Sequence, residues 1–87
     1  MKVHKTDLPG VLLVEPKIHR DARGSFLETW NAARYAEHGI SLPFVQDNVS
    51  RSTRGVLRGL HLQHPNGQGK LVQVLLGEVF DLSLIHI

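Results

Sequence analysis

The residues best suited to chemistry lie in residues 55–63. His61 follows Arg58 by three residues and precedes Gln63 by two, on an otherwise apolar segment. A histidine titrates near neutral pH and can act as a general base. Strict alternation along a strand would put Arg58 and His61 on opposite faces, whereas a bulge at Gly59 would let them converge. A structural histidine bonded to a backbone carbonyl is the alternative for His61 considered alone.

Three cationic side chains could act on an anionic small molecule. Lys70 follows a glycine-rich loop, where its ammonium group could lie beside a developing oxyanion or simply extend into water. Arg23 and Arg58 are candidates for binding phosphate, because a guanidinium group matches phosphate in a bidentate geometry. Each of the three is also compatible with a solvated surface charge.

Amide side chains gather on one face of residues 44–50. Gln46 and Asn48 share that face, and Asp47 lies on the other. Burying an amide without a partner costs about 1–3 kcal/mol, so this face either meets water or lines a ligand pocket. An edge strand that is solvated on both faces is the alternative.

A metal site is only partly present in the sequence. Gly55, His61 and Gln63 reproduce the start of the cupin signature G-x5-H-x-H, with glutamine in place of the second histidine. Gly67 and Gln68 occupy the region where a glutamate ligand is expected. Zinc or ferrous iron needs about three nitrogen or carboxylate ligands. We therefore expect neither a metal nor another cofactor.

The elements that must position these residues are short strands and one brief helix. Asn31 is a good N-cap and Gly39 a good residue after a helix end, which predicts a helix near residues 31–38. A polar turn is expected at residues 19–24 and a hairpin turn at Gly77-Glu78. The expected strands are residues 11–15, 25–30, 44–50, 55–63, 71–76 and 79–84. This pattern predicts an all-β sandwich or barrel.

Composition narrows the class of protein. The chain has 87 residues, 41% of them hydrophobic, with no cysteine and a net charge of +2. These values are ordinary for a small globular domain and exclude a disulfide framework and a disordered tail. Lysine and arginine are scattered, and no apolar run is long enough to span a bilayer. We expect a cytoplasmic protein that binds neither nucleic acid nor membrane.

Six segments together resemble the dTDP-4-dehydrorhamnose 3,5-epimerase family. They are ordered and correctly spaced over nearly the whole chain, and the set is far more specific than any one segment. The matching residues are 15–17, 21–28, 44–48, 56–63, 68–72 and 77–81.

The resemblance implies a metal-free, cupin-type jelly roll (a double-stranded β-helix) that is a homodimer when full length. Such enzymes invert C3 and C5 of dTDP-4-dehydro-6-deoxy-D-glucose to give dTDP-4-dehydro-β-L-rhamnose, in dTDP-rhamnose biosynthesis. By position, His61 resembles the base beside the C4 ketone, and Lys70 resembles the cation at the enolate oxygen. The implied substrate-binding residues are Arg23, Glu28, Gln46, Asp47, Asn48 and Arg58.

Two departures from the family pattern set the expected extent of the domain. Family members continue into a second half that supplies a tyrosine acid, and Tyr35 does not match that position. Residues 82–87 also depart from the family's usual strand end. We therefore expect residues 1–87 to be the N-terminal part of a single domain. The main alternative is a metal-free cupin nucleotide-sugar binding module, or an inactive fragment, without turnover. Gln63 disfavours a metal-dependent cupin oxygenase.

Overall fold

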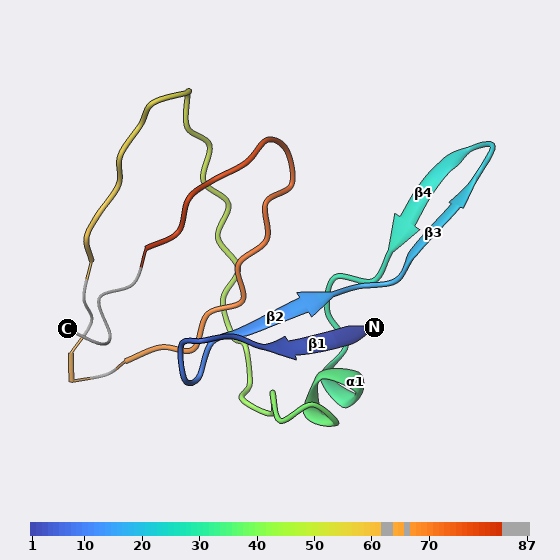
Figure 1. Ribbon diagram of the computed structural model, residues 1–87, viewed down its shortest axis with the longest axis horizontal. Helices are drawn as coiled ribbons and strands as arrows, with labels where there is room; N and C mark the ends of the chain where they lie inside the picture. The colour runs from blue at the N-terminus through green and yellow to red at the C-terminus, as the bar shows by residue number, and fades with distance from the viewer. Residues whose placement is uncertain (62–63, 66, 83–87) are drawn as a thin grey trace. The chain divides into compact units, whose positions relative to one another are not determined.

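The computed structural model describes residues 1–61, 64–65 and 67–82. Within them, all regular structure consists of four strands and one short helix (Figure 1). This confirms the expected all-β class with one helix, and no described helix is long and apolar enough to cross a membrane. Two compact units divide the chain, Met1–Pro43 and Phe44–Ile87. The elements are β1 (Lys2–Lys5), β2 (Leu12–Glu15), β3 (Ile18–Asp21), β4 (Gly24–Leu27) and α1 (Ala32–Ala36).

Strands β1 and β2 form an antiparallel hairpin. β2 was expected, whereas β1 was not, because the polar segment around it carries no strand signal of its own. In the loop, the Leu8 amide donates to the Thr6 hydroxyl at 3.2 Å, and that hydroxyl donates to the Val11 carbonyl at 2.8 Å. Across the strands, His4 Nε2 lies 2.8 Å from a carboxylate oxygen of Glu15. This hydrogen bond, together with the charge of His4, lowers the pKa of Glu15.

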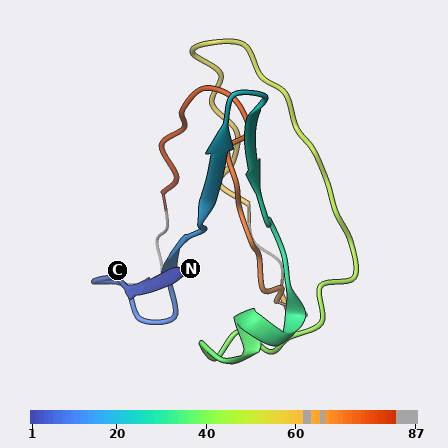
Figure 2. The same cartoon turned by 90° about the vertical axis from the view of Figure 1, so that its right-hand side faces the viewer.

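Strands β3 and β4 form a second antiparallel hairpin, and both views show them side by side (Figures 1 and 2). Asp21 pairs with Gly24, so only Ala22 and Arg23 form the turn. The predicted turn over residues 19–24 was therefore wrong for its first half, which is strand β3. Polar residues suggested a loop there, but every residue of β3 is exposed, so the strand can be polar on both faces.

Helix α1 is the predicted helix. The Asn31 side chain accepts a hydrogen bond from the Arg34 amide at 3.0 Å, which caps the helix, and Gly39 follows its end with φ +83°. Tyr35 is only 3% exposed, the one buried residue of the described chain. Its hydroxyl donates to the Thr29 carbonyl at 3.2 Å. The N-cap and the glycine therefore set the two ends of α1, and Tyr35 attaches it to the segment before it.

The described residues of the second unit form no strand or helix. The strands expected over residues 44–50 and 71–76 are therefore absent. The strands expected over residues 55–63 and 79–84 are also absent in the parts that the structure describes. Residues 62–63 and 83–84 lie outside the described residues. A β-strand is defined by its hydrogen bonds to a neighbouring strand. Alternation of apolar and polar residues along a segment does not by itself provide that neighbouring strand. Accordingly, large apolar side chains stay at least 90% exposed at Val45, Leu57, Leu76 and Phe80.

Candidate functional site

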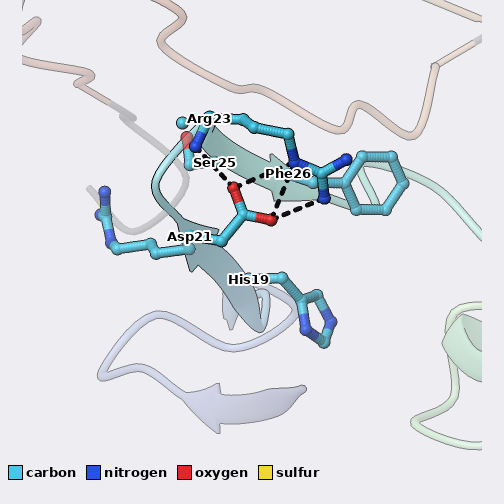
Figure 3. Close-up of a pocket in the computed structure, with 7 residues that line it drawn as sticks. His19, Asp21, Arg23, Ser25 and Phe26 are labelled. Atoms are coloured by element: carbon cyan, nitrogen blue, oxygen red, sulfur yellow. Dashed lines mark hydrogen bonds and ion pairs between the residues drawn. The ribbon is translucent and has the colours of Figure 1, made fainter.

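An open hollow lies on the β3–β4 hairpin and includes one predicted site residue, Arg23. Its volume is about 490 Å³, and both strands line it (Figure 3). His19 and Phe26 pair across the strands, as do Arg20 and Ser25. Since side chains alternate between the faces of a hairpin, the first pair shares a face with Asp21, and the second pair lies on the other.

Asp21 and Arg23 are joined by several hydrogen bonds across the turn (Figure 3). The Arg23 amide donates to Oδ1 of Asp21 at 2.8 Å, and the guanidinium donates to Oδ2 from Nε at 3.2 Å and from Nη2 at 2.6 Å. The side-chain bonds, followed by the backbone bonds, lower the pKa of Asp21, and the same pairing raises the pKa of Arg23.

Exposure limits what this ion pair can do for stability. The Arg23 side chain is 90% exposed and the Asp21 side chain 52%. An ion pair that is this open to solvent contributes little to stability. Its main effect is therefore to fix the direction of the Arg23 guanidinium at the hairpin turn.

Glu28 directly follows β4 and is held by the start of helix α1. Arg34 Nη1 donates to one oxygen of the Glu28 carboxylate at 3.0 Å. The side-chain nitrogen Nδ2 of Asn31 lies 3.5 Å from the other oxygen. Asn31 also caps the helix, so helix formation and the orientation of the Glu28 carboxylate depend on the same residue. Glu28 thus has a defined orientation in the first unit.

The side chains of Gln46 and Asn48 are hydrogen-bonded to each other in the second unit, although the strand on which they were expected to share a face is absent. Gln46 Nε2 donates to Oδ1 of Asn48 at 3.2 Å. Gln46, Asp47 and Asn48 are all exposed. In the structure these polar groups therefore face solvent, and their convergence on a ligand stays a prediction.

The remaining predicted residues are Arg58, His61 and Lys70. Arg58 donates from Nε to the Ser52 hydroxyl at 2.8 Å and from Nη2 to the Arg51 carbonyl at 3.3 Å. His61 and Lys70 are exposed, and within the described residues neither side chain makes a hydrogen bond or an ion pair. Arg58 thus has local partners, while the proposed base and oxyanion cation are directed by none of the described groups.

A β-bulge at Gly59 was one of two arrangements considered for this segment, and it would have brought Arg58 and His61 together. The Gly59 φ of +101° is one that glycine adopts readily. The described residues form no paired strand there, however, so no bulge exists, because a bulge is an extra residue within a ladder. A side chain at position 59 would be strained by this positive φ, which L-residues rarely adopt, and not by crowding, since its Cβ would lie at an ordinary contact distance of 3.4 Å from the His61 amide nitrogen.

The eight predicted residues fall into two groups. Arg23 and Glu28 belong to the first unit and the other six to the second, and each unit is described by itself. In the part of the chain that the structure describes, no three His, Asp or Glu residues lie together as a metal site would need.

Sequence reasoning missed the partners of two site residues. Asp21 and Arg34 hold the charged groups of Arg23 and Glu28, yet neither was assigned a role. The Asp-x-Arg-Gly spacing was the available signal for Asp21, because an aspartate readily accepts the amide of the residue two positions ahead. Arg34 had no comparable signal, since its pairing with Glu28 depends on where helix α1 begins.

Comparison with known proteins identifies what the chain is similar to. The sequence model of the family described as dTDP-4-dehydrorhamnose 3,5-epimerase matches residues 5–84. A protein of that name from Methanothermobacter thermautotrophicus is 52% identical over 80 residues, which cover 92% of this chain and 43% of the relative. Relatives of the same name from Shigella flexneri and Pseudomonas aeruginosa are 52% and 51% identical, each over 97% of this chain and 48% and 47% of their own length. The chain thus spans about half the length of these curated relatives.

Proposed function

The chain belongs to the dTDP-4-dehydrorhamnose 3,5-epimerase family, and we propose from this membership that a protein carrying it epimerises dTDP-4-dehydro-6-deoxy-D-glucose. Inversion at C3 and C5 would give dTDP-4-dehydro-β-L-rhamnose. The observation that carries the proposal is the family match over residues 5–84, which includes every residue predicted to bind or act on substrate.

In this proposal, His61 is the base. It removes the proton from C3, the C–H electron pair forms the C3–C4 double bond, and the C4 carbonyl oxygen takes the negative charge. Return of a proton to C3 from the opposite face inverts that centre, and the same sequence inverts C5. A positioned base contributes about 10²–10⁴ in rate. No electrons leave the substrate in these steps, so the proton transfers need no oxidant or reductant.

Lys70 supplies the positive charge that the enolate requires. An ammonium group beside the C4 oxygen is comparable to an oxyanion-hole donor, the removal of which costs about 3–4 kcal/mol in transition-state stabilisation. The exposed position of Lys70 leaves its ammonium group available to a substrate. Lys70 therefore lowers the barrier to proton removal, and its loss would slow the step at C3 and at C5 alike.

Tyr35 is not the acid that protonates the opposite face. Its ring is buried and its hydroxyl is directed at the Thr29 carbonyl. This agrees with its mismatch to the tyrosine position that the resemblance implies. None of the eight predicted residues is assigned this role either.

The other predicted residues would bind the nucleotide-sugar. Arg23 and Arg58 are the groups suited to its diphosphate, because guanidinium and phosphate pair in a bidentate geometry. From the family resemblance we also propose a homodimer when full length, and from the composition a cytoplasmic protein that acts without nucleic acid or membrane. The polar groups for the rest of the substrate are Glu28, Gln46, Asp47 and Asn48.

A binding module without turnover is the second candidate. The observation that favours it is that none of the eight predicted residues is assigned as the proton donor on the opposite face of the sugar. Such a module would bind dTDP-sugars and leave their protons in place.

Hydrogen exchange at C3 separates the two candidates. A protein that carries the chain is incubated in D2O with dTDP-4-dehydro-6-deoxy-D-glucose, and deuterium at C3 is followed by NMR. Exchange that is lost in His61→Ala supports the base role. Binding without exchange favours the module, and exchange at the normal rate in His61→Ala would show that another group is the base.

A further inference from the structure

The Arg23 guanidinium has two hydrogen-bonding edges, and Asp21 occupies only one. Nε and Nη2 both point to the Asp21 carboxylate, at 3.2 and 2.6 Å from Oδ2. A guanidinium carries five N–H donors in a rigid plane. Two of them are therefore engaged by Asp21, which leaves both hydrogens of Nη1 and the second hydrogen of Nη2.

The remaining donors form a complete binding edge. Nη1 and the second hydrogen of Nη2 point in parallel from the end of the guanidinium, the arrangement that pairs with two oxygens of a phosphate. The Arg23 side chain is 90% exposed, so a ligand in solvent can reach this edge. Arg20 also lines the hollow, from the other face of the hairpin.

Asp21 also fixes the main chain that carries this edge. Its Oδ1 accepts the Arg23 amide at 2.8 Å, within a turn of two residues between β3 and β4. One carboxylate thus restrains both the backbone and the guanidinium of Arg23. An arginine that is already ordered loses less side-chain entropy when it binds a ligand.

From this geometry we propose that Asp21 is a positioning residue, which directs the end edge of Arg23 toward a phosphate-type oxyanion at the β3–β4 turn. The inference rests on the proposed function only in taking Arg23 as a substrate-binding residue. In that function the oxyanion is a phosphate of the nucleotide diphosphate. Asp21 would not need to leave Arg23 when the anion binds, because the two partners use different edges.

The test uses inorganic pyrophosphate as the probe and the ¹⁵N-labelled chain. The Arg23 Nε–Hε resonance and the amides of Ile18–Leu27 are followed by NMR during the titration. Asp21→Asn keeps an oxygen that can accept the Arg23 amide but loses the charge and one acceptor. Asp7→Asn is the matched control, since it removes the same charge from the β1–β2 hairpin.

We expect Asp21→Asn to bind pyrophosphate about three- to tenfold more weakly than the parent chain, because the anion must then order the guanidinium itself. Asp7→Asn should bind as the parent does or slightly better, since it removes a repelling charge. In an Arg23→Gln background, Asp21→Asn should have no further effect. The measurements should include about 1 M salt, at which the Debye length is about 3 Å, so that long-range attraction does not hide the positioning effect.

Three outcomes would overturn the inference. The first is equal or tighter binding by Asp21→Asn with the hairpin amides unchanged. The second is a parent Arg23 resonance that does not respond to pyrophosphate, and the third is a lack of cross-strand contacts between His19 and Phe26, which would mean that the hairpin is not formed. A different result would count against the proposed function and leave the inference standing. In that result pyrophosphate binds, but dTDP binds no more tightly than pyrophosphate and no exchange occurs at C3 of the sugar.

Discussion

Trp30 and Tyr35 pack against each other, with ring centroids 4.5 Å apart and ring planes inclined at 49°. Tilted aromatic pairs at this distance are favourable beyond the area that they bury. The contact joins the segment after β4 to helix α1 and contains the buried residue of the described chain. Helix α1 has only five residues, too few to be stable without such a contact.

Replacing Tyr35 should therefore unfold helix α1. In Tyr35→Ala the ring contact is lost, and we expect the helix amides to lose protection. Tyr35→Phe is the matched control, because it keeps the ring and loses only the bond to Thr29, worth about 0.5–1.5 kcal/mol. Trp30 is the only tryptophan, so its fluorescence reports on the pair. Its emission should shift to the red in the alanine variant, and an unchanged emission would contradict this account.

Asn31→Ala should weaken the same helix through its first turn. Loss of an N-cap costs about 0.5–2 kcal/mol of stability. The substitution also removes the side-chain amide group of Asn31 that lies beside the Glu28 carboxylate. Asn31→Asp should preserve the cap, since a carboxylate also accepts the Arg34 amide. Amide hydrogen exchange of Ala32–Ala36 measures the effect, and equal protection in the alanine and aspartate variants would show that the cap is unimportant.

The β3–β4 hairpin should lose a small part of its stability in acid, because the exposed Asp21–Arg23 pair contributes little. The folded-state pKa of Asp21 is lowered by the bonds from Arg23, so the stabilisation is present above the unfolded-state pKa of about 3.9. It is lost as the pH falls through the lower folded-state value. The Asp21 carboxyl carbon and the Arg23 Nε–Hε resonance, followed by NMR from pH 6 to 2, measure this. Asp21→Asn should abolish the step.

The β1–β2 hairpin should show an analogous acid transition at Glu15. His4 lowers the folded-state pKa of Glu15, so its contribution is present above the unfolded-state value of about 4.3 and is lost as the pH falls through the folded-state value. The Glu15 carboxyl carbon resonance gives the titration directly. His4→Gln should move the midpoint up toward the unfolded-state value, and a midpoint that does not move would exclude His4 as the cause.

Arg58 and His61 should separate binding from chemistry in a protein with epimerase activity. His61→Ala should lower C3 exchange by at least about 10²-fold with nucleotide affinity nearly unchanged, because the base acts on the sugar. Arg58→Ala should mainly raise the dissociation constant for dTDP. Calorimetry and deuterium exchange measure the two effects, and a purely catalytic defect in Arg58→Ala would disagree with the diphosphate role.

The chain by itself should associate or be poorly ordered in its second unit. Val45, Leu57, Leu76 and Phe80 are each at least 90% exposed, and apolar groups in that state favour association. Sedimentation velocity and a two-dimensional amide spectrum decide this. A monomer with sharp, dispersed signals for residues 44–82 would refute the prediction.

Local signals in the sequence determined part of the structure correctly. The cap at Asn31, the glycine at position 39 and strand β2 were all predicted, because each depends on residues close along the chain. The matching segments also determined the family, since their order and spacing carry more information than any one element. His19–Asp21 was misassigned because polar residues are typical of turns, and only pairing with β4 shows that they form a strand.

Tertiary contacts decided what periodicity could not. Alternation predicted strands over residues 44–50 and 71–76, but a strand needs a hydrogen-bonded neighbour, and the described second unit supplies none. The Arg23 edge and the Glu28 carboxylate were likewise beyond sequence reasoning, because their directions depend on Asp21 across a turn and on Arg34 in a capped helix. Residue types thus identified the groups that could bind and react, whereas contacts between elements set the directions of those groups, because orientation arises from partners brought together by folding.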